Sequence, residues 1–588
     1  MQTKLLYDIK DNYGENLLRE RGVKNIQSFL HPGFEDFEPP SFLNNIGKAA
    51  DIYLNALKKE KTHIALIVDC DVDGYTSAAI IYQYTKIIAK LFNCEPLIDF
   101  FIHEGKQHGL QDLWEEVSSQ SYDLLIIPDA GSNDGQYIKE LDIPTIVLDH
   151  HLIETEEKDY LDINSLPTAA LVNNQSSEKC LNKNLSGAGV VYKFIWYCDS
   201  LLEIKEKDNF IDLAALGICA DMMSGLEVEN QAFWKYGFSN LKNPFFKAIV
   251  EKQAYSITGE TAPTEETIIN CLNPITVAFY VVPMINAMNR VGTMEEKRRM
   301  FLAFVDGKQL VPSNKRGAKG ELTELCIESV RECTNARSHQ NKDKEKITEK
   351  LEMKIFKQDL LENKILFIRL EDDDVFPAEL NGLVATELAQ KYKRPTIVAR
   401  LNDQGFIRGS ARGIDESKME SFKQFLNDTN LFEYTRGHDM AFGISISNNK
   451  LMDFHKIANN QLADYDFGNS YYKVEFEREG NDNSITNIIK DLDRYKNTWS
   501  QKNQEPLISV QNIKINTNDI MIMGRLKNTI KIQYNGVSYL KFFAKDLIEE
   551  LESYRGDITI NIIGTGKINK WMNRETPQII IKELEIQK

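Results

Sequence analysis

The sequence predicts an α/β fold with two α/β domains, a long helix that joins them and a C-terminal β-barrel of the OB type. Short apolar runs at 64–68, 124–127 and 145–148 alternate with helix-like segments, as in a doubly wound parallel sheet. The same alternation returns after residue 364. From about residue 507 onward it gives way to short β runs at regular spacing, which are typical of a small barrel.

The first half of the chain divides into three expected segments. Residues 1–60 read as helical, and we expect them to pack on the domain that follows. Residues 61–305 form the first α/β domain, built on the parallel sheet. Residues 321–376 contain no glycine and no proline and are dense in Lys and Glu. A solvated helix is therefore expected in the linker region 306–360.

The second half divides into two further segments. Residues 361–465 form a smaller α/β domain, in which the strand-like runs 365–368 and 396–399 flank a helix-like run. Residues 470–588 form the barrel, which closes with the apolar run 578–581.

Length and composition restrict the class of protein. The chain has 588 residues, which suits about three or four domains. No apolar run approaches the length of a membrane span and the N-terminus lacks a signal-peptide segment, so we expect a cytoplasmic protein without a membrane segment. The eight cysteines form no C-x-x-C pair and are expected to be reduced. The net charge of −17 argues against a nucleic-acid binder, unless a basic groove lies on an acidic body.

Three aspartates follow the first predicted strand. Asp69, Asp71 and Asp73 alternate along an extended segment, so they point the same way and repel one another unless a cation is present. Their hard oxygen atoms suit Mg²⁺ or Mn²⁺. An EF-hand calcium loop would need a terminal Glu and further oxygen ligands, which the apolar and hydroxyl residues after Gly74 do not supply. A solvated turn remains the alternative for this motif taken alone.

The next two predicted strands also end in polar residues. Asp129 follows the second strand, and Asp149-His150-His151 follow the third. Ligands of open α/β sheets bind outside the carboxyl ends of the strands, and two consecutive histidines beside an acid are rarely needed for packing. Asp221 ends an apolar helix, where an acid is unfavourable to the helix dipole. This favours a metal ligand at Asp221 over an ordinary surface residue.

Several aspartates with one or two histidines suit a dinuclear site that activates water against a phosphoester. Asp129 is the natural candidate to bridge two ions. No Walker loop, dinucleotide-binding glycine fingerprint or Ser-His-Asp order is present. Phosphoester hydrolysis is therefore the predicted reaction.

These motifs resemble those of the DHH phosphoesterase superfamily, and nearly the whole chain resembles its RecJ family of single-strand-specific exonucleases. The second α/β domain resembles the family's companion domain (DHHA1), and the barrel resembles its OB nucleic-acid-binding domain. The segments that carry the resemblance are 18–22, 29–32, 69–74, 129–131, 149–151, 213–221, 283–290, 409–412, 437–443, 567–571 and 578–581.

The resemblance implies two Mn²⁺ or Mg²⁺ ions and 5′-to-3′ degradation of single-stranded DNA in repair and recombination. It implies a monomer whose partners are single-stranded DNA and, in addition, a helicase or single-strand-binding protein. His151 would contact the scissile phosphate or protonate the leaving oxygen, next to Asp149. The implied metal residues are Asp69, Asp71, Asp73, Asp129, His150 and Asp221. The implied nucleic-acid or phosphate contacts are Asn286, Arg290, Ser410, Arg412, Gly437, His438 and Trp571.

The chain departs from the family pattern at several positions. Asn289, Glu379 and Arg436 stand where glycine is usual, and Gly413 stands where serine is common. The segment 103–110 has His103 and Gln107-His108 in place of an arginine and a Tyr-Gly pair. The metal motifs themselves are intact.

Two other functions fit parts of this pattern. The first is a phosphodiesterase of short oligonucleotides or cyclic dinucleotides, which would need no additional barrel. The second is a replication scaffold of the same fold that has lost its metals, which the retained acidic motifs disfavour. On the barrel, Trp571, Tyr534, Tyr539 and Phe542 are candidates for stacking on bases, although at least half of them are expected to be core.

Overall fold

The structure is a computed structural model that describes residues 1–587 except 104, 106, 107, 157–159, 372, 373, 375, 572 and 573, and only the backbone of Trp571. The chain forms two compact units. The parallel-sheet unit consists of Asn25–Gln340 and Asn497–Asn503. The barrel unit consists of Met1–Lys24, Asn341–Lys496 and Gln504–Lys588.

A five-stranded parallel sheet forms the centre of the parallel-sheet unit. In spatial order the strands are β3 (Glu95–Ile102), β2 (Lys61–Val68), β4 (Leu124–Pro128), β5 (Thr145–Asp149) and β6 (Ala169–Asn173). The strands β4, β5 and β6 and most of β2 are buried on both faces, which explains why they appear in the sequence as apolar runs, whereas the edge strand β3 is partly exposed.

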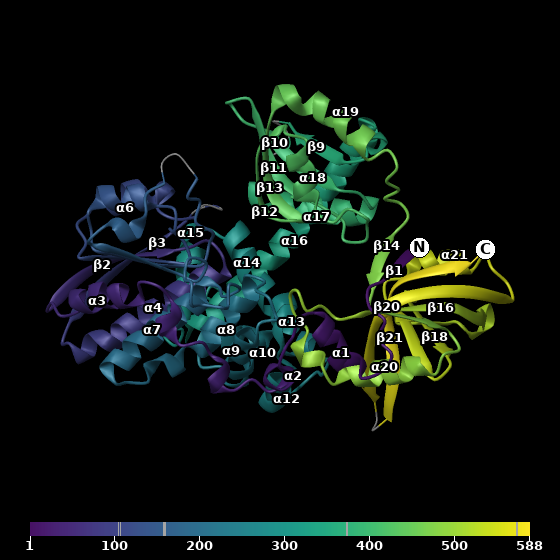
Figure 1. Ribbon diagram of the computed structural model, residues 1–588, viewed down its shortest axis with the longest axis horizontal. Coiled ribbons are helices and arrows are strands. Elements are labelled where there is room, and N and C mark those ends of the chain that lie inside the picture. The colour runs from purple at the N-terminus through teal and green to yellow at the C-terminus, as the bar shows by residue number, and fades with distance from the viewer. Residues whose placement is uncertain are drawn as a thin grey trace. The chain divides into compact units, whose positions relative to one another are not determined.

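Helices cover both faces of this sheet. Figure 1 shows α6 (Gly135–Leu141) on one side of it and α3 (Ile46–Ala56), α4 (Val72–Leu91) and α7 (Gly187–Leu202) on the other. The alternate residues of β2 separate in the same way. Ile64 and Leu66 belong to the larger core with α3, α4 and α7, whereas Ala65 and Ile67 face the smaller core under α6.

Further helices complete the parallel-sheet unit, most of them beside the larger core, while the helix that carries Val117 packs in the smaller core. A π-helical turn at Val277–Val281 precedes α14, and the first turn of α14 contains a proline. These helices are α2 (Ile26–Leu30), α5 (Trp114–Ser118), α8 (Ile211–Ala220), α9 (Val228–Ser239), α10 (Pro244–Lys252), α11 (Ala254–Thr258), α12 (Glu265–Cys271), α13 (Pro274–Thr276), α14 (Val282–Val291) and α15 (Met294–Asp306).

The expected long linker helix is present as α16 (Leu325–Lys357). It follows the short hairpin of β7 (Leu310–Pro312) and β8 (Leu322–Glu324). Glu328 ties the first turn of the helix to this hairpin, because its carboxylate accepts hydrogen bonds from the Ser313 hydroxyl at 3.0 Å and the Asn314 N–H at 2.8 Å. Arg331, one turn later, donates to the same carboxylate.

The barrel unit contains a second α/β layer. Its core forms between the mixed sheet and the helices α18 (Phe422–Asp428) and α19 (Leu451–Gln461), while α17 (Asn381–Tyr392) packs on β10 and β11. The strand order is β12 (Phe432–His438), β13 (Ala441–Ser447), β11 (Phe406–Arg412), β10 (Thr396–Leu401) and β9 (Leu366–Leu370).

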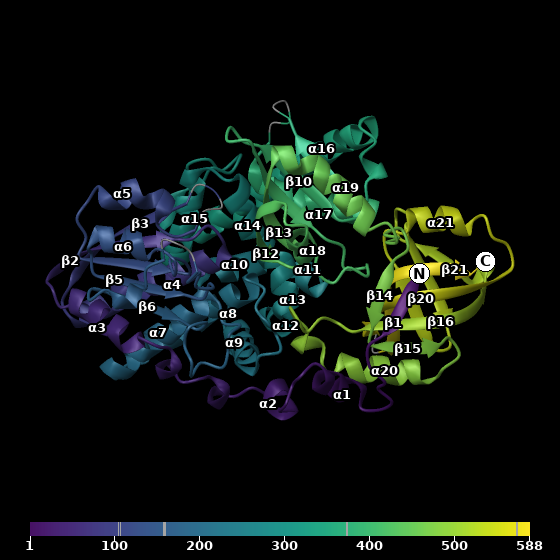
Figure 2. The same cartoon turned by 45° about the horizontal axis from the view of Figure 1, so that its top comes forward.

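The C-terminal part folds as a seven-stranded sheet, in agreement with the expected OB-type barrel. Figure 2 shows its strands with α20 (Ser484–Asp493) and α21 (Lys545–Leu551) beside them. The strand order is β15 (Phe476–Glu479), β16 (Leu507–Asn516), β20 (Asp557–Trp571), β21 (Arg574–Gln587), β19 (Val537–Lys541), β18 (Thr529–Tyr534) and β17 (Met521–Met523).

The N-terminal segment differs from the expectation that residues 1–60 are helical and pack on the first α/β domain. The chain begins with β1 (Gln2–Leu5), which pairs in parallel with β14 (Tyr471–Val474) (Figure 2). Helix α1 (Tyr13–Glu20) also belongs to the barrel unit. Only the part from Asn25 onward joins the parallel-sheet unit. Residues 1–5 are too few to show a strand pattern, so this partner could not be identified from the sequence.

In the part of the chain that the structure describes, no single helix has both the length and the apolar character to cross a membrane; one strongly bent pair, Glu265–Cys271 with Pro274–Val291, meets both criteria only when the two are taken together.

The hydrogen bonds around Glu328 predict a pH-dependent contribution to stability. Burial alone would raise the pKa of this carboxyl, but hydrogen bonds from Arg331 and Asn314 lower it to about 2. The carboxylate therefore stabilises the fold fully above its unfolded pKa of 4.5, and this contribution is lost as the pH falls toward 2.

We expect Glu328→Gln to destabilise the protein by on the order of 2 kcal/mol at neutral pH. The gap in melting temperature between the variant and the wild type should narrow as the pH is lowered from about 5 to 3. Glu345→Gln, at an exposed position of the same helix, is the control and should have little effect at either pH. A gap that stays constant with pH would contradict the assignment.

Candidate metal centre

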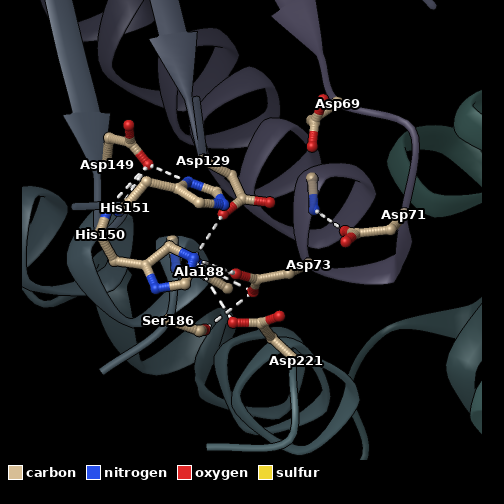
Figure 3. A network of polar contacts seen from close by, with 12 residues as sticks. Asp69, Asp71, Asp73, Asp129, Asp149, His150, His151, Ser186, Ala188 and Asp221 are labelled. Carbon is tan, nitrogen blue, oxygen red and sulfur yellow. Dashed lines mark hydrogen bonds and ion pairs between the residues drawn. The ribbon is translucent and has the colours of Figure 1, made fainter. Parts of the chain in front are cut away.

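The carboxyl ends of three adjacent strands meet at one edge of the parallel sheet. Asp69 follows β2, Asp129 follows β4 and Asp149 is the last residue of β5. Because β2, β4 and β5 are neighbours, their ends lie side by side, and Figure 3 shows the acidic side chains gathered there with His150 and His151. The predicted convergence of the motifs is thus present in the structure.

The N-termini of two helices hold the aspartates of the first motif. Asp71 is the N-cap of α4, and its carboxylate accepts a hydrogen bond from the Gly74 N–H at 3.0 Å. Asp73, in the first turn, faces the start of α7. Its oxygens accept hydrogen bonds from the Ser186 hydroxyl at 2.8 Å, the Gly187 N–H at 2.7 Å and the Ala188 N–H at 3.1 Å. Backbone donors at a helix N-terminus favour a carboxylate in its charged form.

Glycine makes this close approach possible. A Cβ atom on Gly187 would lie 2.3 Å from Asp129 Oδ1, and one on Gly217 would lie 2.2 Å from Asp73 Oδ1. Asp129 itself has a φ of 62°, in the left-handed region that non-glycine residues rarely adopt. Strained backbone of this kind persists where the surroundings enforce it and is concentrated at functional sites.

His150 lies among the carboxylates. Its Nε2 atom is 3.2 Å from Asp129 Oδ1, 3.4 Å from Asp221 Oδ2 and 4.0 Å from Asp73 Oδ2 (Figure 3). Asp221 is the C-cap residue of α8. The helix dipole disfavours an acid at this position, but the position places the Asp221 carboxylate in the cluster. The imidazole is buried, and burial lowers its pKa, which favours the neutral form that binds metals.

Asp149 orients the second histidine. Its carboxylate accepts hydrogen bonds from the Ser132 N–H at 3.0 Å, the His150 N–H at 2.7 Å and His151 Nδ1 at 2.8 Å. Burial alone would raise the pKa of Asp149, but His151 and these donors hold it well below its usual range. Burial likewise would lower the pKa of His151, yet the charge of Asp149 and the hydrogen bond raise it to about 10. An ion pair therefore forms beside the cluster at neutral pH.

The remaining carboxylates destabilise one another. Burial and the charges of Asp69 and Asp73 raise the pKa of Asp71 to about 6. Burial and the charge of Asp73 raise the pKa of Asp129 and of Asp221 well above the usual range. Negative charges crowded in this way are stabilised when a cation lies between them.

The donor atoms fit divalent cations. Asp69 Oδ1 and Asp129 Oδ1 are buried and make no hydrogen bond within the described part of the chain. In the part of the chain that the structure describes, donor atoms that lie within 4.8 Å of one another form three groups made up entirely of the predicted metal and catalytic residues, and Asp129 belongs to two of them. The groups are Asp69 with Asp71 and Asp129, Asp73 with His150 and Asp221, and Asp129 with Asp149, His150 and His151. Oxygen and imidazole donors of this kind suit Mn²⁺ and Mg²⁺.

The structure therefore gathers all eight residues that the sequence motifs single out for metal binding and catalysis. It also adds supporting residues that the sequence argument missed. Ser186 and Ser132 hold Asp73 and Asp149, and the Asn173 side chain donates to both the Ser132 hydroxyl and the His151 carbonyl at 2.9 Å. In the sequence, the small residues at 186–189 indicated the start of a helix. They did not indicate that this helix start donates hydrogen bonds to the Asp73 carboxylate.

The predicted phosphate contacts of the second α/β layer lie in the barrel unit on one face of its sheet. In register, Arg412 stands opposite Ala441, which stands opposite His438. The next such row contains Ser410, Gly443 and Arg436. Since directly opposed residues share a face of a sheet, these two rows present Ser410, Arg412, Arg436 and His438 on the same face.

The Arg412 guanidinium lies over the start of α17. A Cβ atom on Gly382 would be 2.4 Å from the Arg412 guanidinium and 3.7 Å from the Ser410 hydroxyl, so a side chain at this point of the helix would displace the guanidinium. A guanidinium, a hydroxyl and a helix N-terminus are three groups that bind phosphate, and here they converge. Gly437, in the adjacent row, has a φ of 131°, which a side chain would strain.

The structure says less about the remaining residues that were predicted to contact nucleic acid. Asn286 and Arg290 lie one turn apart on α14 and so share a face of that helix. The side chain of Trp571 lies outside the described residues. Of the barrel aromatics, Tyr539 is fully buried core, whereas Phe542 is 49% exposed. The roles of these residues stay predictions.

Family models match two parts of the chain. The model of the DHH family N-terminal domain matches residues 63–218, which include the sheet and its acidic motifs. The model of the RecJ OB domain matches residues 483–583.

Whole-chain comparisons agree with these matches. YorK of Bacillus subtilis (strain 168), a prophage-derived protein named as a single-strand DNA-specific exonuclease, is 33% identical over 598 residues, which cover 100% of this chain and 98% of that protein. The single-stranded-DNA-specific exonuclease RecJ of the same strain is 24% identical over 97% of this chain and 67% of its own length.

The crystal structure of RecJ from Thermus thermophilus in complex with Mn²⁺ superposes with a TM-score of 0.69 at 18% identity, over 100% of this chain and 79% of that one, and so shares the fold. The chain belongs to the RecJ-like family of single-strand DNA-specific exonucleases within the DHH superfamily.

Proposed function

We propose that this protein is a metal-dependent exonuclease that hydrolyses the phosphodiester bonds of single-stranded DNA from the 5′ end, in DNA repair or recombination. The observation that carries the proposal is the buried cluster of aspartates and histidines at the sheet edge, in which Asp129 is shared between two groups of donor atoms. The family membership supports the substrate class. The 5′-to-3′ direction and the biological role are taken from the family, and the direction is tested below.

Two groups of residues would hold the two divalent ions. Asp69 and Asp71 with Asp129 form one group, and Asp73, His150 and Asp221 form the other, so Asp129 is placed to bridge them. When bound, such ions neutralise the charge of the phosphate and acidify a water molecule. The protein's own contribution is to fix the positions of the Asp71 and Asp73 carboxylates through the backbone donors of α4 and α7.

His151 is placed to act on the substrate. Its Nδ1 is fixed by Asp149, which leaves Nε2 on a side chain that is 47% exposed. With its pKa raised to about 10, the ring carries a proton at neutral pH. We propose that Nε2 donates a hydrogen bond to a phosphate oxygen and delivers its proton to the leaving oxygen.

The phosphate-binding face of the barrel unit would hold the DNA backbone. Ser410, Arg412 and the N-terminus of α17 converge on one point, and His438 lies two strands away, in β12, on the same face of the sheet. None of these groups reads a base, so the contact would be independent of sequence. We further propose that the protein acts as a monomer and works beside a helicase or single-strand-binding protein, which co-purification and sedimentation would test.

Digestion of strands labelled at either end tests the proposal as a whole. With Mn²⁺ or Mg²⁺, a 5′-labelled single strand should release labelled mononucleotide at once, while a 3′-labelled strand shortens progressively. EDTA should abolish both. Cleavage confined to dinucleotides would favour the phosphodiesterase of short substrates, and no cleavage with any divalent ion would favour the scaffold.

Asp129→Asn tests the bridging role. The amide keeps the shape but removes the charge, so we expect Mn²⁺ binding to weaken and kcat to fall by more than roughly 100-fold, with the melting temperature little changed. Calorimetric titration of Mn²⁺ and single-turnover kinetics measure the two effects. Asp112→Asn, at an exposed position of the same unit, is the control. Near-normal turnover of Asp129→Asn would contradict the bridging role.

Arg412→Ala tests the phosphate-binding face. Loss of one charge-assisted contact to phosphate should raise KM roughly 10-fold and leave kcat within about a factor of two. Arg369→Ala removes a guanidinium from the edge strand β9 of the same sheet, in a row that does not contain Ser410 or Arg412, and should change neither constant. If KM of Arg412→Ala stays at the wild-type value, Arg412 does not bind the strand.

A further inference from the structure

Beside the cluster of aspartates and histidines lies a group of donors with different chemistry. Cys70 follows Asp69 in the loop between β2 and α4, and His108 comes from the loop after β3. The donor atoms of Asp69, Cys70 and His108 all lie within 4.8 Å of one another. His108 Nδ1 is 2.7 Å from Asp69 Oδ2, so an imidazole nitrogen and a carboxylate oxygen already meet there.

This donor set favours a different class of metal ion. Carboxylate oxygens alone suit Mg²⁺ and Mn²⁺, whereas a thiolate with an imidazole selects Zn²⁺ and the later transition metals. A carboxylate, an imidazole and a thiolate are three protein ligands, the number found in zinc sites that keep one position open.

Asp69 connects this group to the cluster of the proposed function. The same residue belongs to the group with Asp71 and Asp129, and its side chain is only 1% exposed. Its second oxygen, Oδ1, is buried and makes no hydrogen bond to any residue that the structure describes. One oxygen is thus occupied by His108 while the other has no partner, which is the arrangement of a carboxylate placed to ligate a cation.

An ion would have access to the group from solvent. The His108 side chain is 52% exposed and Cys70 is only partly buried. The His108 and His151 rings lie with their centroids 6.0 Å apart, so the group opens beside the histidine that is proposed to act on the substrate.

We propose that Asp69, Cys70 and His108 form a third metal position, selective for Zn²⁺ or a similar borderline ion. On binding, the ion replaces the proton of the Cys70 thiol and the proton between His108 Nδ1 and Asp69 Oδ2, and both protons leave to solvent. Occupancy of this position engages Asp69 and so inhibits hydrolysis supported by Mg²⁺ or Mn²⁺. The binding site stands on the geometry alone, and only the inhibitory effect rests on the proposed function.

Cobalt spectroscopy tests the site without reference to catalysis. The full-length protein is titrated with Co²⁺ in the absence of Mg²⁺ and Mn²⁺, because those ions would compete for Asp69. Ligation by a thiolate produces an intense sulfur-to-cobalt charge-transfer absorption in the near ultraviolet. We expect this absorption in the wild type and its loss in Cys70→Ser. Cys271→Ser is the matched control, because Cys70 and Cys271 are the two cysteines that are partly rather than fully buried, and it should keep the absorption.

His108→Ala should weaken Co²⁺ binding by at least roughly 10-fold in the same titration. An absorption that is absent from the wild type, that survives in Cys70→Ser or that disappears in Cys271→Ser would overturn the site.

Inhibition is measured separately. Zn²⁺ added to a Mg²⁺-supported digestion should inhibit the wild type at concentrations at least roughly 10-fold lower than those that inhibit Cys70→Ser, while the two proteins hydrolyse DNA equally without Zn²⁺. Equal sensitivity of the two proteins to Zn²⁺ would refute the inhibitory role. If no variant cleaves DNA with Mg²⁺ or Mn²⁺, the proposed nuclease function fails while the cobalt result still decides the metal site.

Discussion

Mutual repulsion between buried carboxylates is the constraint on which the rest of this structure depends. Asp71, Asp129 and Asp221 are each pushed toward the neutral form by burial and by neighbouring acids. Such a cluster is unfavourable in the folded chain unless the scaffold forces it together, and three features do so. Parallel strands end at a common edge, helix N-termini donate to Asp71 and Asp73, and glycines at 187 and 217 let helices approach to within contact of the acids. The fold therefore stores electrostatic free energy that a divalent cation releases on binding.

The fold was predictable to the extent that it depends on short-range patterns. The strands β2, β4 and β5 appear as apolar runs because they are buried on both faces, and α16 appears as a long stretch without glycine or proline. The pairing of β1 with β14 was not predictable, since it joins residues more than four hundred positions apart and five residues carry too weak a pattern. The same holds for the division of the N-terminal segment between the two units.

The site was predictable where the acids and histidines come directly after strands, because strand ends of a parallel sheet meet. The sequence could not show which groups hold those side chains in place. Ser186 and the backbone N–H groups of Gly187 and Ala188 act on Asp73 from more than a hundred residues away. His108 was noticed only as a departure from the family pattern, and its contact with Asp69 depends on the path of a loop that no local rule fixes.

The parallel pairing of the first strand also affects how the protein is made. β1 needs β14, and the amino group of Met1 lies 2.5 Å from Glu585 Oε1, almost at the other end of the chain. During synthesis the first residues therefore have no partner until nearly all of the protein has left the ribosome, whereas the parallel sheet can form much earlier. Extra residues placed next to β1 would crowd its pairing with β14, so a fusion partner is better attached away from this strand.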